Sequence, residues 1–350
     1  MTRLHALFVL ICLAAIALVV GYAWGTRRAD PGGAAVVSEI DDPVRLASVQ
    51  SRPHIVYVNK QRGSGFGRVA VSPLDALDGP RYLTPLACER VYFAAGSGVC
   101  LTVESTVVGS YYAYLFNDRF EAVHRIPLQG YPSRTQVSPD GRTAAFTVFV
   151  RGDSYASGNL STRTTLVETA SGKKIADLEE FDAIRYGGRF RQVDFNYWGV
   201  TFLHAPDLFY ATLQSGGRPW LVQGRIGQRE VRVLNEGVEC PSLSPDDSRI
   251  VFKSRDVAAA RPSWRLKVLS LGSRAEVILG ETRSVDDQAT WLDPDRVLYA
   301  LLDEDSNAAA AGVTNLWSVA VDSGATPTLI LKGAYSPAVV ARPSEDDGVQ

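Results

Sequence analysis

The four histidines of this 350-residue chain are the first residues to consider for metal binding or proton transfer. They are His5, His54, His124 and His204, and none lies within one helical turn or one strand pair of another. Metal ligands and acid–base partners must come close together, so this spacing predicts neither a metal site nor a catalytic histidine. We expect surface or partly buried histidines.

Glycine patterns carry no catalytic signature either. A Gly-x-Ser-x-Gly motif presents a serine nucleophile, and certain glycine-rich loops ahead of a helix bind phosphates. The stretches GSGFG at Gly63–Gly67 and GSG at Gly96–Gly98 match neither pattern and fall in expected loops. We therefore predict no catalytic residue and no cofactor-binding residue.

Two acidic stretches are candidates for ion sites. Asp303, Asp305 and Asn307 have the spacing of a calcium loop, but Ala308 stands where that loop needs glycine and Thr314 where it needs glutamate. We expect a solvated loop here and no metal. The stretch SVDDQATW, residues 284–291, receives the same interpretation.

Three cysteines lie outside the apolar N-terminal stretch: Cys88, Cys100 and Cys240. An odd number in an exported domain leaves at least one unpaired, or paired between chains. Cys88 and Cys100 flank the expected hairpin at Gly96–Gly98 at unequal distances. Either a disulfide between them or buried free thiols are consistent with this spacing.

Repeated turns in the sequence indicate the fold that would have to position any functional site. VSPDGRTAAF, residues 137–146, and LSPDDSRIVFKS, residues 243–254, share a Ser-Pro-Asp turn that runs into an apolar strand. Proline presets φ in such a turn, aspartate accepts backbone N–H groups, and glycine tolerates positive φ. WLDPDRVLYALL, residues 291–302, and HAPDLFYATL, residues 204–213, are looser copies.

The pattern after each turn also repeats: a strand, a long loop, a strand, a glycine-containing hairpin and another strand. With the strand before the turn, each unit has four antiparallel strands. The turn prolines lie at irregular spacings around the length of one propeller blade. Sheets of four strands repeated radially form a β-propeller.

The two clear turns resemble the WD40-like repeats of the TolB-type six-bladed β-propeller family. The resemblance extends over roughly Arg52 to Ala341. It implies an all-β fold, an exported location and a structural role for the Ser-Pro-Asp turn. The chain has too few residues before its first strand for the α/β domain that precedes the propeller in TolB, so that domain's partner contacts are not carried over.

Blade boundaries are set by these units. We place five blades at 88–131, 132–181, 182–237, 238–285 and 286–334. The stretches HIVYVN, GRVAVSPL and RYLTPL would supply three strands of a sixth blade, and YSPAVVAR near the C-terminus its fourth. We expect Ala338–Val340 to pair with Ile55–Val58, because that pairing removes two exposed strand edges.

The N-terminal run from Ala6 to Gly25 has no charged residue and is long enough to span a bilayer as a helix. Arg3 precedes it, and Arg27 and Arg28 come after it. We predict a transmembrane anchor with the propeller on the extracytoplasmic side of the cell membrane. Secretion after signal cleavage is the alternative.

The expected organisation is therefore a membrane anchor or signal segment (1–28), a flexible linker (29–51), a β-propeller (52–342) and a disordered tail (343–350). Lys and Arg total 36 against 38 Asp and Glu, for a net charge of −2. This balance argues against a nucleic-acid partner.

Two functional classes stay open. We favour a non-enzymatic, membrane-anchored propeller that binds a protein or other ligand of the cell envelope at the propeller mouth. The alternative is a propeller hydrolase or lactonase-type enzyme that uses carboxylates or a metal in the central channel. Its residues would come from different blades, so sequence motifs would not reveal them.

Overall fold

The structure, a computed structural model, describes residues 5, 12–18, 37–105, 109–150, 161–256 and 263–341. The chain divides into two units, Met1–Val37 and Ser38–Gln350. In the first unit residues 12–18 are helical, and most of the expected span Ala6–Gly25 lies outside the described residues, as does the expected tail 343–350. No described helix is long and apolar enough to cross a membrane.

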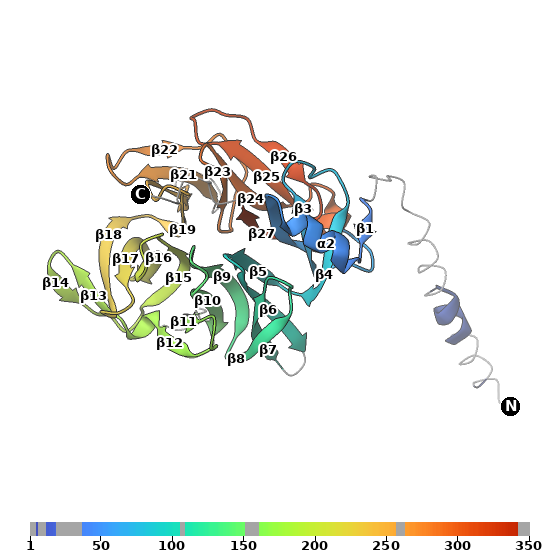
Figure 1. The fold of residues 1–350 in the computed structure, drawn as a ribbon, viewed down its shortest axis with the longest axis horizontal. Helices are drawn as coiled ribbons and strands as arrows, with labels where there is room; N and C mark the ends of the chain where they lie inside the picture. The colour runs from blue at the N-terminus through green and yellow to red at the C-terminus, as the bar shows by residue number, and fades with distance from the viewer. Residues whose placement is uncertain are drawn as a thin grey trace. The chain divides into compact units, whose positions relative to one another are not determined.

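The second unit is a six-bladed β-propeller (Figure 1). Its six sheets succeed one another around a central axis in chain order, and the inner strands of neighbouring sheets are in contact. We number the blades 1 to 6 from the sheet that contains both the first and the last strands. The six-blade prediction is thereby confirmed.

Blade 1 has the strand order β27-β2-β3-β4-β1 from the axis outward: β27 (Ala334–Val340), β2 (His54–Asn59), β3 (Arg68–Pro73), β4 (Arg81–Ala87) and β1 (Glu39–Ile40). Blades 2 and 3 each have four strands: β5 (Arg90–Ala94), β6 (Ser97–Ser105), β7 (Ser110–Asn117) and β8 (Ala122–Leu128); then β9 (Tyr131–Val137), β10 (Thr143–Val150), β11 (Ser161–Glu168) and β12 (Lys174–Asp177).

Blade 4 contains β15 (Asn196–Phe202), β16 (Leu208–Ser215), β17 (Arg218–Arg225) and β18 (Glu230–Glu236), extended outward by β13 (Asp182–Arg185) and β14 (Gly188–Phe190). Blade 5 contains β19 (Glu239–Leu243), β20 (Arg249–Arg255), β21 (Trp264–Ser270) and β22 (Glu276–Ile278). Blade 6 contains β23 (Thr290–Asp293), β24 (Arg296–Leu302), β25 (Thr314–Ala320) and β26 (Thr328–Leu331).

Ring closure occurs through the predicted strands. Ile55 pairs with Val339 and Val56 with Ala338, in antiparallel register. A buried arginine reinforces the closure from the outer side of the same blade: the Arg81 guanidinium donates to the carbonyl of Gly333 at 2.7 Å, just before β27. The two ends of the propeller are therefore held by backbone pairing and by a buried side chain.

The Ser-Pro-Asp turns share one hydrogen-bond pattern. In blade 3 the Ser138 hydroxyl donates to the Asp140 carboxylate at 2.5 Å, and that carboxylate accepts the Arg142 N–H at 3.1 Å. In blade 5 Ser244 donates to Asp246 at 2.5 Å, and Asp246 accepts the Ser248 N–H at 3.2 Å. Each turn joins the inner strand to the second strand of its blade, so its role is architectural.

Gly141 completes the first of these turns for two reasons. Its φ of +72° is in the left-handed region, and a Cβ atom there would lie 2.8 Å from the carbonyl oxygen of Ala95 in blade 2. The turn thus lies directly against the neighbouring blade, which restricts the position to glycine.

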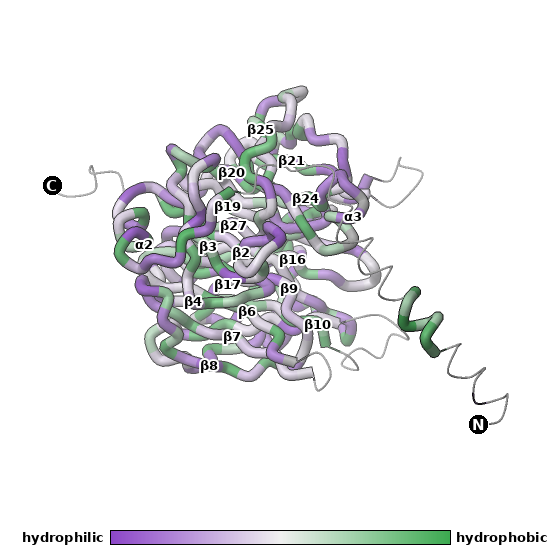
Figure 2. The backbone as a smooth tube through the Cα atoms, turned by 90° about the vertical axis from the view of Figure 1, so that its right-hand side faces the viewer, coloured by the Kyte–Doolittle hydropathy of each residue, from purple (hydrophilic) through white to green (hydrophobic). Residues whose placement is uncertain are grey.

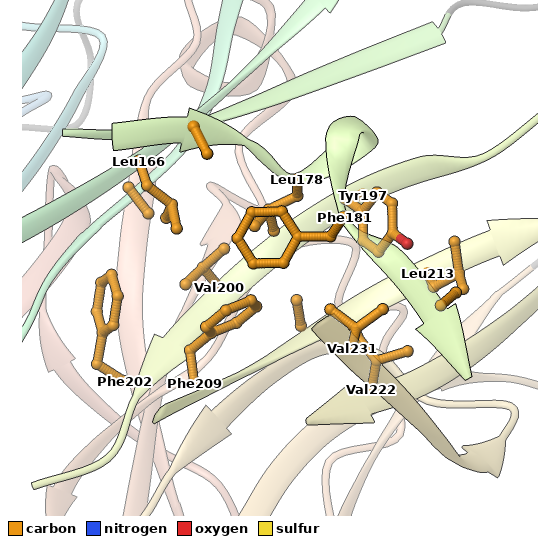
Figure 3. Packing of buried hydrophobic residues seen from close by; sticks show 14 residues of the cluster. Leu166, Leu178, Phe181, Tyr197, Val200, Phe202, Phe209, Leu213, Val222 and Val231 are labelled. Atoms are coloured by element: carbon orange, nitrogen blue, oxygen red, sulfur yellow. The ribbon is translucent and has the colours of Figure 1, made fainter. Parts of the chain in front are cut away.

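Hydrophobic residues pack between successive sheets. Figure 3 shows one such cluster, in which Leu166 of blade 3 faces residues of blade 4 such as Val200, Phe209 and Val222. Because strands alternate their side chains, apolar and polar residues alternate along several of them, visible as alternating green and purple segments in Figure 2. This packing fixes the angle between blades.

The segment 38–50 differs from the expected flexible linker. Its strand β1 pairs in parallel with β4, and helix α2 (Pro43–Gln50) begins at Asp42, whose carboxylate accepts the Val44 N–H at 2.9 Å. Leu46 and Val49 on this helix are buried in the core shared by blades 1 and 2. The short apolar repeat Leu46–Val49 gives the segment a face to bury, so it belongs to the propeller unit.

Candidate functional site

The inner strands carry a recurrent β-bulge near the channel. In β27, β19 and β15, two residues lie opposite one residue of the second strand: Ser336–Pro337, Cys240–Pro241 and Gly199–Val200. The first residue of each pair has positive φ, at 52°, 50° and 65°. A bulge re-aims the side chains of its strand, and these bulges shape the wall of the channel on one face of the propeller.

We call that face the mouth face. It is the face where the inner strands begin and the second strands end, opposite the Ser-Pro-Asp turns, because consecutive strands of each blade are antiparallel. The charged residues that could form a site lie near these strand ends.

Three charged residues from blades 2, 3 and 6 meet in the channel. Arg90 of β5 contacts the Asp287 carboxylate through Nη1 at 2.8 Å, and Arg134 of β9 does so through Nε at 3.3 Å. Their side chains are 14%, 14% and 11% exposed for Arg90, Arg134 and Asp287. Burial opposes ionisation of Asp287, but the two guanidinium groups outweigh it and lower its pKa to about 2.

The channel beside this cluster is narrow. A cavity of about 40 Å³ lies against Arg90, Arg134 and Asp287, which is room for a few water molecules at most. This cavity has no room for a larger ligand.

A second charged group is centred on Lys253 of β20 and reaches the surface at Asp286, whose side chain is 56% exposed. Lys253 is 6% exposed, donates to the Asp286 carboxylate and lies 3.9 Å from the Glu239 carboxylate. Burial alone would lower the pKa of Lys253, yet the neighbouring Asp286 carboxylate helps to raise it above its ordinary value. The lysine therefore stays charged at neutral pH.

Two pockets lie on the mouth face, and Asp286 lines both. One, of about 540 Å³, lies between blades 1 and 6 and is lined by residues that include Lys60, Arg283, Leu302 and Tyr335. The other, of about 550 Å³, is lined by blades 3, 4 and 5, and we call it the side pocket. Both volumes fall within the range of roughly 300–1,000 Å³ typical of small-ligand sites.

The three histidines of the propeller unit do not contribute to this site. His54 is buried in β2, where burial lowers its pKa, and its Nδ1 lies 2.8 Å from the carbonyl of Arg52. His124 contacts the Ala170 carbonyl and His204 contacts Asp247, both away from the mouth. Among the described residues, no three His, Cys, Asp or Glu side chains lie close enough together to hold a metal ion.

The acidic residues with calcium-loop spacing have structural contacts. Asp305 caps the short helix α3 (Ser306–Ala310) by accepting the N–H groups of Asn307 and Ala308, both at 2.9 Å. Asp303 accepts the Asp305 N–H at 2.8 Å and the Asn315 side-chain amide at 2.8 Å. Each carboxylate thus already accepts hydrogen bonds from the chain itself.

Of the alternatives for the cysteines, the structure contains the disulfide between Cys88 and Cys100. It joins the start of blade 2 to β6. Cys240 is left as a buried free thiol on the bulge of β19, lining the side pocket next to Lys253 and Arg134.

Sequence reasoning missed the acidic pair at the mouth. The expectation of a solvated loop for residues 284–291 is wrong for Asp287, which is buried between two arginines. A usable signal was present: polar residues begin several inner strands, at Arg90, Asn196 and Glu239. Once a propeller is inferred, those positions converge on the channel.

No protein-family model matches the chain, and no curated protein matches it. Solved structures are similar in fold. The crystal structure of a nidogen/laminin complex aligns at a TM-score of 0.53 and 11% identity, over 82% of this chain and 98% of that chain. A putative TolB from Agrobacterium tumefaciens aligns at 0.46 and 12% identity, over 81% and 91% of the two chains.

The β-propeller domain of the Trilobed protease from Pyrococcus furiosus aligns at a TM-score of 0.38 and 13% identity, over 69% of this chain and 70% of that one. At such identities the likeness concerns the fold alone.

Proposed function

We propose that this protein is a membrane-anchored, extracytoplasmic β-propeller of the TolB-like kind, which binds a partner or ligand at its mouth face without catalysing a reaction. One observation carries the proposal. Two pockets of about 540 and 550 Å³ lie on the same face, on either side of Asp286, next to a buried cluster of charged residues from several blades.

The charges of this cluster favour binding over acid–base catalysis. A general acid or base works best with a pKa near the operating pH. At the mouth the pKa values move away from neutrality: that of Asp287 is lowered to about 2, and that of Lys253 is raised. Such groups keep fixed charges, which suit recognition and positioning.

Two features support an exported location. The disulfide between Cys88 and Cys100 is of a kind that persists in oxidising compartments. The uncharged run from Ala6 to Gly25 is long enough to serve as a membrane anchor. The matching Ser-Pro-Asp turns of blades 3 and 5 support the TolB-like assignment.

Site-specific photo-crosslinking tests the binding face. A photoreactive residue at Leu302, which is exposed at the end of β24 on the mouth face, should capture a defined partner or ligand from native membranes. The matched control is Val123, similarly exposed at the start of β8 on the opposite face. Adducts formed only from Val123 would overturn the proposal.

Two further measurements complete the test. Terminal sequencing of protein from native membranes should find Ala6–Gly25 retained, and a mature N-terminus near Trp24 would contradict the anchor. Turnover of ester or lactone substrates by the purified protein that disappears in Asp287→Asn or Lys253→Met would instead favour the hydrolase alternative.

A further inference from the structure

We propose that the side pocket binds a carbohydrate, as a mono- or disaccharide or the end of a longer glycan. The inference rests on the proposed function and names the ligand class for one of its two pockets. It depends on the side chains that line the pocket and on which of their polar groups are still free. These lining residues come from blades 3, 4 and 5 and from Asp286, which precedes the first strand of blade 6.

Blade 4 supplies an aromatic side chain and two amides. Asn196 and Trp198 lie two residues apart on β15, so they point to the same side of the sheet. Tyr197, between them, points to the opposite side into the core, as Figure 3 shows. Gln214 of β16 lies directly opposite Asn196 in the ladder and also lines the pocket.

Blade 3 supplies the facing wall. Phe149 at the end of β10 pairs with Thr162 on β11, and both line the pocket. The Thr162 N–H donates to the Asn196 side-chain oxygen at 2.7 Å, which fixes the two blades relative to each other at this point. The pocket therefore has an aromatic residue on each of two walls.

Several polar groups in the pocket have no partner within the described part of the chain. The Ser161 hydroxyl is buried, since the residue is 4% exposed, and makes no hydrogen bond. Leaving such a buried hydroxyl unpaired is unfavourable. Among the hydrogen bonds of the described residues, none involves the Gln214 side-chain amide or the Trp198 indole N–H. A ligand that both donates and accepts would satisfy all three.

The charged residues of the pocket are, by contrast, largely satisfied. Asp194 accepts from the Ser215 hydroxyl and the Gly216 N–H, both at 2.6 Å, and Asp286 pairs with Lys253. Formal charges cancel over the lining residues, which are Arg134, Lys253 and Arg255 on one side and Asp194, Glu239 and Asp286 on the other. The pocket has no surplus charge that would select a phosphate or a metal cation.

A sugar fits what remains. Its hydroxyls each donate and accept, which matches a serine hydroxyl, an amide and an indole N–H. Its C–H faces are apolar and pack on aromatic rings such as those of Trp198 and Phe149. A volume of about 550 Å³ has room for one or two sugar rings. A purely apolar ligand would leave the free polar groups unsatisfied.

Calorimetry on the whole protein, with glucose, N-acetylglucosamine, glucuronic acid, maltose and cellobiose as probes, tests this. We expect saturable binding of at least one sugar. Trp198→Phe and Gln214→Ala should each weaken it tenfold or more. The matched control is Trp317→Phe, which removes another half-buried tryptophan, on β25, that does not line the side pocket. This variant should bind like the wild type.

Thermal melting of each variant distinguishes loss of binding from loss of folding. Gln214→Ala should perturb the fold less, because the Gln214 amide makes no hydrogen bond to another described residue. Absence of binding by every sugar overturns the inference, as does a sugar affinity that both pocket variants leave unchanged. Short peptides that bind in a Trp198-dependent manner would also overturn it, yet would leave the proposed binding function intact. Photo-crosslinked adducts formed only from Val123, on the opposite face, would refute the proposed binding function independently of the sugar measurements.

Discussion

Replacing Asp287 by asparagine changes few atoms but should lower the free energy of unfolding of the propeller substantially. The variant keeps the side-chain shape but leaves Arg90 and Arg134 buried without a counter-charge. The folded-state pKa of Asp287 is about 2 against an ordinary value of 3.8, which corresponds to about 2 kcal/mol of favourable interaction for the ionised carboxylate. Removing one partner of a buried ion pair costs about 3–5 kcal/mol. We expect a loss of about 2–4 kcal/mol.

Urea unfolding at neutral pH measures this loss, because urea leaves the electrostatic interactions unscreened. The matched control is Asp293→Asn, whose pair with Arg296 lies at the surface, with side chains 32% and 53% exposed. That change should cost less than about 1 kcal/mol. If Asp287→Asn costs no more than the control, the cluster is not a buried interaction and the reasoning is refuted.

The pH dependence gives a second measure of the same contact. A carboxyl whose folded pKa is lowered stabilises the protein above its unfolded pKa, and this stabilisation is lost as pH falls toward the folded value. For Asp287 the window runs from about pH 4 down to about pH 2. The wild type should lose about 2 kcal/mol more stability than Asp287→Asn across that window; equal losses would contradict the assignment.

Three further predictions concern the scaffold. Asp140→Ala should lower stability by about 1 kcal/mol through loss of its turn hydrogen bonds, without weakening binding at the mouth face; an unchanged melting temperature with lost binding would contradict this. Burial raises the pKa of Glu179 to about 8, so the folded state holds a proton that the unfolded state releases above pH 4.5. The free energy of unfolding of the wild type should therefore fall by up to about 1.4 kcal/mol per pH unit as the pH rises from 5 to 8. Urea unfolding of Glu179→Gln over the same pH range should show a flatter dependence. Parallel pH dependences of the two proteins would count against a buried neutral carboxyl at Glu179. Deleting everything after Ala334 removes nearly all of β27 and should abolish cooperative melting of the monomer, whereas deletion after Arg342 should not; similar behaviour of both truncations would refute closure through β27.

The fold was predictable because its signals are local. A Ser-Pro-Asp turn carries its own hydrogen bonds within five residues, as the contacts of Ser138 and Asp140 show. The pairing of Ile55 with Val339 came from counting strands, since one end of the chain lacked an inner strand and the other had one to spare. Helix α2 escaped prediction because only Leu46 and Val49 give it an apolar face, too few to show a period.

The mouth site was not predictable in the same way, because its contacts join residues about 150 to 200 positions apart in the chain. Asp287 looks like a solvated residue in its own loop, and only the convergence of β5 and β9 on the axis makes it a counter-ion for Arg90 and Arg134. The side pocket has the same origin: Trp198, Gln214 and Ser161 carry no local signal until blades 3 and 4 place them around one volume.

The β-bulges of the inner strands indicate where functional residues can be sought in the sequence of a β-propeller. The bulge re-aims the residues around it, and in β19 it places Cys240 on the pocket wall next to Lys253. In β27 the equivalent residue is Ser336, whose hydroxyl instead holds the backbone of Val91 in the next blade at 3.0 Å. One backbone feature thus serves either blade-to-blade contact or the pocket, depending on its side chain. The first residues of each inner strand, read together across blades, are therefore where the sequence of a propeller should be searched for function.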